Sequence, residues 1–227
     1  MNTAGALTWI SGPVVRARVT GALSVLEQVQ VGEARLAGEV IALAHDIATI
    51  QVYEEANGLR PGEPLFGTGA PLSASLGPGL LANIYDGLQR PLEVVRDQQG
   101  IYLRRGSQAD ALPSKNWKFT PRAQTGDLVQ AGSLLGTIPE TPLIEHRVLV
   151  PFGVKGKIVD FAPEGEYPLD HVMATVEDSA GGRYPVTMLE RWPIRSARRF
   201  SAPQIDSGPA LSPAWAVRRR PWSAAYA

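Results

Sequence analysis

The chain contains no cysteine among its 227 residues. Disulfide bonds, thiol nucleophiles and thiolate metal sites are therefore excluded. Histidine is also scarce, because only His45, His146 and His171 are present, far apart in the sequence and without the close spacing typical of metal ligands. We interpret these three side chains as ordinary polar residues and expect no metal site.

An excess of charge of either sign is also missing. Lys plus Arg and Asp plus Glu number 22 each, so the formal net charge is zero. No overall field favours nucleic acid or an anionic membrane. No apolar run approaches the roughly 20 residues of a membrane-spanning helix, and residues 1–7 lack the basic start and apolar core of a signal peptide. These features predict a cytosolic globular protein without direct membrane insertion.

Glycine and proline, by contrast, are plentiful at 23 and 19 residues and separate many short apolar runs. This pattern is typical of a mainly β fold with short strands joined by turns. Within residues 1–75 we expect strands at 7–10, from 14 onward, and at 28–31, 34–43 and 47–53. Turns about every ten residues favour a small closed β-barrel, which leaves no strand edge unpaired.

Residues 76–109 are predicted to form a linker with one short helix. The expected helix runs from Leu80 to Leu88, with Leu80, Leu81, Ile84 and Leu88 on one apolar face. Pro78 suits its first turn and Gly87 its left-handed end, and Pro91 prevents its continuation.

Residues 110–190 are predicted to form a second, separate β module. We expect a tight hairpin over 125–137, strands at 146–151, from 156, at 172–177 and at 184–189, and turns at 164–166 and 179–182. From residue 191 the chain begins a further linker, and from about 195 it loses any strand or helix period. We expect the end of the chain, which carries Arg218, Arg219 and Arg220 between two tryptophans, to be a mobile, solvated tail.

No catalytic or cofactor-binding residue is predicted. The segment Val150–Ile158 resembles a phosphate loop only superficially, because Pro151 replaces the first glycine and Ile158 replaces the magnesium-binding hydroxyl residue. The pairs Glu54–Glu55 and Glu164–Glu166 are interpreted as solvated turn residues, because a general acid needs a buried carboxyl group. No grouping of Ser, His and Asp supports a triad.

The most specific feature is the run from Leu76 to Leu92. It resembles the signature that follows the barrel in the catalytic A subunit of V-type and archaeal-type rotary ATPases. The residues that carry this resemblance are Gly77, Pro78, Gly79, Tyr85, Asp86, Gly87, Gln89, Arg90 and Pro91. Further segments resemble the same family in the same order: 11–15, 38–41, 50–55, 58–64, 68–73, 117–121, 150–158, 162–167 and 191–195. We interpret the signature residues as structural.

The resemblance implies a role in a larger machine. Residues 1–75 are expected to join the neighbouring barrels of a hexameric ring that alternates with B subunits, and residues 110–190 to contact the peripheral stalk. The implied location is the cytoplasmic sector peripheral to the membrane. Members of the family bind Mg-ATP through a phosphate loop, whereas this sequence departs from them after Gly208. We therefore expect a truncated or frame-slipped gene product, or a fragmentary gene model, without ATP binding or hydrolysis of its own.

Two other classes of function remain open at this point. The segments 126–135 and 153–159 also resemble a biotinyl or lipoyl carrier domain, but a carrier needs a lysine at a hairpin tip and residues 137–150 contain none. Lys155 and Lys157 lie elsewhere in the predicted module. An RNA-binding barrel would need an aromatic platform and a basic groove, neither of which the sequence indicates.

Overall fold

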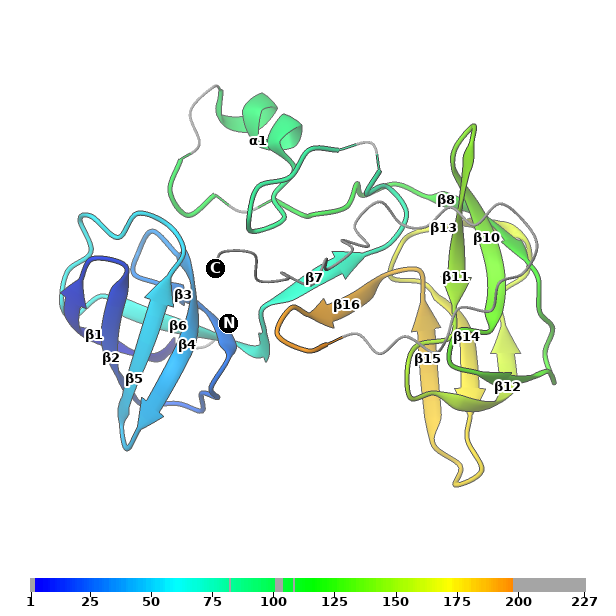
Figure 1. Ribbon diagram of the computed structural model, residues 1–227, viewed down its shortest axis with the longest axis horizontal. Helices are drawn as coiled ribbons and strands as arrows, with labels where there is room; N and C mark the ends of the chain where they lie inside the picture. Colours follow the sequence, from blue (N-terminus) through cyan, green and yellow to red (C-terminus); the bar gives the residue numbers. More distant parts are fainter. Residues whose placement is uncertain (1–2, 82, 101–103, 108, 198–227) are drawn as a thin grey trace, which may run out of the picture. The chain divides into compact units, whose positions relative to one another are not determined.

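The computed structural model describes residues 3–81, 83–100, 104–107 and 109–197, and the fold of these residues is mainly β (Figure 1). The predicted tail, including Arg218, Arg219 and Arg220, lies outside the described residues. No helix within the described part of the chain has the length and apolar character needed to cross a membrane.

A closed six-stranded barrel forms the first part of the chain, as the sequence predicts. Its strands are β1 (Thr3–Ser11), β2 (Val14–Val19), β3 (Glu27–Val31), β4 (Leu36–Ala44), β5 (Ile47–Val52) and β6 (Pro64–Pro71). They pair antiparallel in the order β1-β2-β5-β4-β3-β6, and β6 closes onto β1. Alternate aliphatic residues such as Val15, Ala17, Val29 and Val31 point inward and are fully buried. Each large aliphatic side chain buried in this way contributes about 1.5–3 kcal/mol.

The predicted helix at Leu80–Leu88 is wrong. None of its described residues is helical, and Leu81 and Ile84 are exposed rather than packed on a common face. The side chain of Asp86 explains the difference, because its Oδ1 atom accepts hydrogen bonds from the backbone N–H groups of Leu88 and Arg90. An Asp that bonds the backbone ahead of it offers the chain a turn in place of a helix.

The helix of the linker lies just after this turn. Helix α1 (Leu92–Gln99) follows Pro91, whose extended conformation (φ −70°, ψ 114°) suits the residue before a first helical turn. Gly100, with a φ of 84°, ends the helix and donates its N–H to the carbonyl of Arg96. A short helix is therefore present in the linker, but it begins at Leu92, after Pro91, and not at Leu80.

The second module consists of two four-stranded sheets around one core. One sheet has the order β11-β10-β8-β13 and the other β15-β14-β12-β9. The strands are β8 (Trp117–Pro121), β9 (Leu128–Gln130), β10 (Leu134–Thr141), β11 (Ile144–Leu149), β12 (Lys155–Phe161), β13 (Gly165–Tyr167), β14 (Val172–Glu177) and β15 (Arg183–Thr187). Both sheets contribute to the core, for example through Phe119 and Ile138 from the first and Ile158, Met173 and Val176 from the second.

Two local predictions within this module are wrong. Residues 125–137 do not form a hairpin, because β9 pairs with β12 whereas β10 pairs with β11 and β8. The turn at Gly132 carries the chain from one sheet to the other. The predicted turn at 164–166 overlaps β13, in which Gly165 lies opposite Phe119 and pairs with the first sheet.

A two-stranded ladder joins the chain just before the linker to the chain just after the second module. Strand β7 (Ser73–Leu76) pairs antiparallel with β16 (Glu190–Pro193), so that Ser73 lies opposite Pro193 and Leu76 opposite Glu190. The N–H of Ile194 extends the ladder by donating to the carbonyl of Leu72 at 3.0 Å. The strand predicted at 184–189 thus ends at Thr187, and β16 is a separate strand.

Candidate functional site

Asp86 and Arg90 organise the signature loop. Asp86 Oδ1 accepts the N–H groups of Leu88 and Arg90 at 3.0 and 2.8 Å, and Asp86 Oδ2 accepts Arg90 Nε at 2.7 Å. Burial raises the pKa of Asp86, but the hydrogen bonds from Arg90 and Leu88 outweigh it and leave the pKa below 3.8. The carboxylate is therefore held ionised as the centre of the turn.

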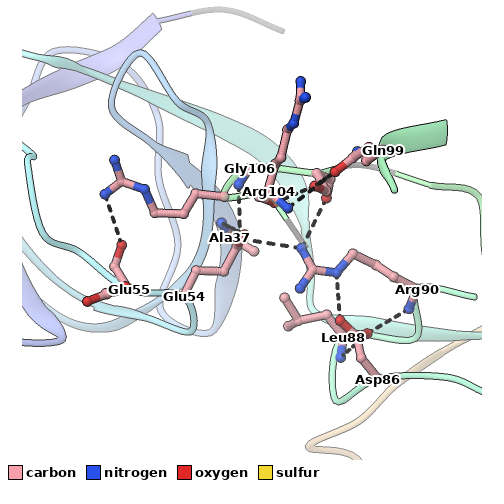
Figure 2. Close-up of polar contacts among 11 residues, drawn as sticks. Ala37, Glu54, Glu55, Asp86, Leu88, Arg90, Gln99, Arg104 and Gly106 are labelled. Carbon is pink, nitrogen blue, oxygen red and sulfur yellow. Dashed lines mark hydrogen bonds and ion pairs between the residues drawn. The ribbon is translucent and has the colours of Figure 1, made fainter. Parts of the chain in front are cut away.

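Arg90 connects this loop to the barrel (Figure 2). Its guanidinium is almost fully buried and lies 3.4 Å from Glu54 Oε2, while Nη1 also donates to the carbonyl of Ser107 at 3.1 Å. Glu54 follows β5 and accepts the backbone N–H groups of Ala37 and Gly106 at 3.2 and 2.9 Å. The prediction that Glu54 is solvated is therefore wrong, since only 9% of its side chain is exposed.

A polar cavity of about 420 Å³ lies beside this network. Residues of the barrel and of the linker line it, among them Gln28, Arg35, Glu54, Arg90 and Asp110. Two guanidinium groups and two carboxylates give its wall no formal net charge. No excess of positive charge in this cavity favours a phosphate-bearing ligand.

Tyr85 and Gly79 fix the other end of the signature. The Tyr85 hydroxyl donates to the carbonyl of Ala111 at 2.8 Å, and burial raises the pKa of this phenol. Glu140 Oε1 accepts the N–H groups of Gly79 and Leu81 at 2.7 and 3.1 Å. Gly79 has a φ of 103°, and a Cβ atom there would lie 2.7 Å from the Pro113 ring, so the position requires glycine.

The remaining signature residues, apart from Gly87, make contacts with other parts of the chain. Gly77 and Pro78 are buried, and a Cβ on Gly77 would lie 3.0 Å from Leu112. Gln89 pairs with the backbone of Ser75, and Pro91 forms an isolated bridge with Tyr85. Gly87 is exposed and its added Cβ would meet no atom within 4 Å. The structure thus brings the signature residues together as one folded loop, with Gly87 at its surface.

A second polar cluster, formed by Glu39, Tyr53 and Arg195, is not predicted from the sequence. Glu39 of β4 accepts hydrogen bonds from the Tyr53 hydroxyl at 2.7 Å and from Arg195 Nη2 at 2.7 Å. The hydrogen bond from Arg195 outweighs burial and lowers the pKa of Glu39. Because 156 residues separate Glu39 from Arg195, no local pattern links them.

The other side chains considered from sequence do not converge on a reactive centre. His45 lies in a turn with a φ of 55°, and His171 stacks on Tyr167 with ring centroids 4.5 Å apart. Within the described residues, no three His, Asp or Glu side chains are grouped to hold a metal ion. Lys155 and Lys157 lie in β12, whereas Pro142 and Leu143 occupy the tip between β10 and β11, so the module lacks the hairpin-tip lysine of a carrier.

Comparisons with known proteins agree with this arrangement. Residues 8–69 match the beta-barrel domain of the ATP synthase alpha/beta family, and residues 109–195 match the ATPsynthase alpha/beta subunit barrel-sandwich domain. The chain is 47% identical over 201 residues to the A subunit of the A-type ATP synthase of Pyrococcus horikoshii, covering 88% of this chain and 21% of that one.

Two further relatives are also A-type ATP synthase A subunits. That of Methanopyrus kandleri is 46% identical over 197 residues, and that of Thermococcus onnurineus is 49% identical over 197 residues. Each alignment covers 86% of this chain, and 33% and 34% of the respective relative. The chain therefore spans a fifth to a third of the length of the curated relatives it matches. With both of its β modules matched in order, the chain belongs to the ATP synthase alpha/beta family and is a homologue of the A subunits of A-type ATP synthases.

Proposed function

We propose that this chain supplies the non-nucleotide-binding, amino-terminal part of the A subunit of a V/A-type rotary ATP synthase or ATPase. In this role it serves assembly rather than catalysis, and the complete complex couples ATP to transport of protons or sodium ions in a sector peripheral to the membrane. The observation that carries the proposal is the closed barrel followed by the barrel-sandwich module, in the order in which the two family domains match.

The barrel surface supports contact with neighbouring barrels, including those of B subunits. Val25 and Leu26 are 51% and 41% exposed, and Ile41 and Leu43 of β4 are 42% and 39% exposed. The N–H of Leu26 donates to the carbonyl of Val40, so the first pair lies beside the start of the second. We call these four residues the barrel patch. Exposed apolar side chains gathered on one face are typical of a surface that a partner covers.

The tip of the β10–β11 hairpin supports contact with the peripheral stalk. Leu143 is 90% exposed there, and both strands of the hairpin belong to the first sheet, which shares its core with the second. A stiff module that presents an apolar side chain at its tip suits a contact that resists torque. The domain limits that we propose for these roles are 1–75 for the barrel, 76–109 for the linker and 110–190 for the stalk-contacting module.

Two experiments test the proposal. Mixing the chain with a B subunit should give a complex in native mass spectrometry, and Ile41→Asp combined with Leu43→Asp should abolish it. Leu128→Asp is the matched control, because Leu128 is 85% exposed but belongs to the second module. Equal loss of the complex in both variants, or no complex with the unaltered chain, would contradict the assembly role.

The absence of catalysis is tested separately. ATP hydrolysis needs backbone N–H groups and a lysine around the phosphates, together with a magnesium ligand. The 227 residues contain Gly-Lys only at Gly156–Lys157, which Ile158 follows in place of Ser or Thr. Isothermal titration with Mg-ATP should therefore give no saturable binding, and a saturable isotherm would overturn this part of the proposal.

A further inference from the structure

Glu39 is buried on the side of the barrel wall where a strand residue is normally in contact with water. Along β4, Leu36 and Val40 point into the barrel core, so the alternation of the strand directs Glu39 outward. Its exposure is nevertheless 0%. An outward carboxylate becomes buried only when another part of the chain covers it.

The covering groups are Tyr53 and Arg195. Tyr53 lies beside β4. Its N–H donates to the carbonyl of Ala37, and its hydroxyl donates to Glu39 Oε2. Arg195 lies just beyond β16 and reaches both carboxylate oxygens, with Nη2 at 2.7 Å from Oε2 and Nε at 3.4 Å from Oε1. Within the described residues, Arg195 is the cation that forms an ion pair with Glu39.

The two side chains of this ion pair differ in their exposure to water. The Glu39 side chain is 1% exposed, whereas that of Arg195 is 51% exposed. Water therefore already reaches the guanidinium, and Arg195 regains little hydration by leaving. The N–H of Ile194 bonds to the carbonyl of Leu72, just after β6, and the ion pair then ties the chain that leaves the second module to Glu39 of the barrel.

We propose that Glu39, Tyr53 and Arg195 form a latch that holds residues 194–196 against the barrel, and that opening the latch frees these residues while the β7–β16 ladder and both β modules stay folded. The device goes beyond the assembly role proposed above. It gives the chain segment that leaves the second module two positions, docked and released, and Arg195 supplies the ion pair that favours the docked position.

Hydrogen exchange followed by mass spectrometry tests the latch in the full chain. Arg195→Gln should raise the exchange rate of the peptide covering residues 190–196 on the order of 10-fold, because a charged hydrogen bond to a buried group is lost. Peptides from β14 in the second module should not change. The matched control is Arg191→Gln, because Arg191 is an exposed arginine on β16 without an ion pair in the described part of the chain.

Two further variants keep the proposal falsifiable if Arg195→Gln folds poorly. Tyr53→Phe removes one hydrogen bond to Glu39 and keeps the ring, so it should give a smaller rise in the same peptide. Glu39→Gln should match Arg195→Gln, and the double variant should exchange no faster than either single one, because both changes remove one interaction. Additive effects, or equal exchange in Arg195→Gln and Arg191→Gln, would overturn the latch.

Discussion

Gln89 and Ser75 exchange two hydrogen bonds of 2.7 Å. The Gln89 side-chain amide donates from Nε2 to the Ser75 carbonyl and accepts the Ser75 N–H at Oε1. A side chain of the signature loop thus pairs with β7 in the way that a neighbouring strand would. Gln89 holds this position with a φ of 59°, in the left-handed region that glutamine rarely occupies.

Two substitutions of Gln89 separate the contribution of its hydrogen bonds from the cost of its left-handed backbone. Gln89→Ala loses both hydrogen bonds and keeps the left-handed strain, so it should lower the free energy of unfolding by about 1–3 kcal/mol. Gln89→Gly loses the same bonds but relieves the strain, and should be less harmful than alanine by about 1 kcal/mol. Urea denaturation measures both values, and a glycine variant less stable than the alanine variant would refute this account.

Asp86→Asn should destabilise the chain by about 1–3 kcal/mol, because it leaves the buried Arg90 with only the more distant Glu54 as a counter-ion. Asp97→Asn is the matched control, since Asp97 pairs with Arg96 at the surface and is 72% exposed. That change should stay within about 0.5 kcal/mol. Thermal and chemical denaturation compare the two, and equal effects would mean that the signature ion pair contributes no stability.

Gly79→Ala tests close packing against backbone strain. Gly79 and Gly62 both have positive φ angles, 103° and 93°, but a Cβ at Gly62 would meet no atom within 4 Å. Gly62→Ala should therefore show the left-handed strain alone, about 1–2 kcal/mol. Gly79→Ala should cost about 1–3 kcal/mol more, through the clash with Pro113. Equal losses in denaturation curves would exclude that clash as a determinant.

The stability contributed by Glu39 should depend on pH in a defined direction. Its pKa is lowered below 4.5 in the folded chain, chiefly by the hydrogen bond from Arg195. A carboxyl group with a lowered folded pKa stabilises the fold fully above its unfolded pKa and loses that contribution as the pH falls through the folded pKa. The stability gap between the unaltered chain and Glu39→Gln should therefore hold near pH 7 and shrink below about pH 4.5. Denaturation at several pH values measures it, and a gap that widens on acidification would contradict the sign.

The positions of most strands follow from local sequence, but the pairing of some does not. Alternation places Val172–Glu177 correctly as β14, and regular turn spacing indicates the closed barrel. The turn at Gly132 has the same local chemistry whether the next strand returns beside β9 or crosses to the other sheet. The choice rests on contacts of β9 with β12 and of β10 with β8, which pair segments that lie apart in the chain.

The candidate site shows the same division. Asp86 and Arg90 belong to a recognisable signature, yet apolar spacing at Leu80–Leu88 favours a helix that the Asp86 side chain replaces with a turn. Glu54 looks solvated in sequence because the groups that bury it, Arg90 and Gly106, come from the later linker. Long-range ion pairs of this kind leave no local pattern by which they can be recognised.

The antiparallel pairing of β7 with β16 places the two ends of the segment that holds the linker and the second module one strand spacing apart, about 5 Å. Leu76 and Glu190 face each other across that spacing. A segment whose two ends lie side by side in this way is inserted into the chain at a single place. A short turn from residue 76 to residue 190 would close the gap that its removal leaves, and Glu54 would then lose its partners Arg90 and Gly106.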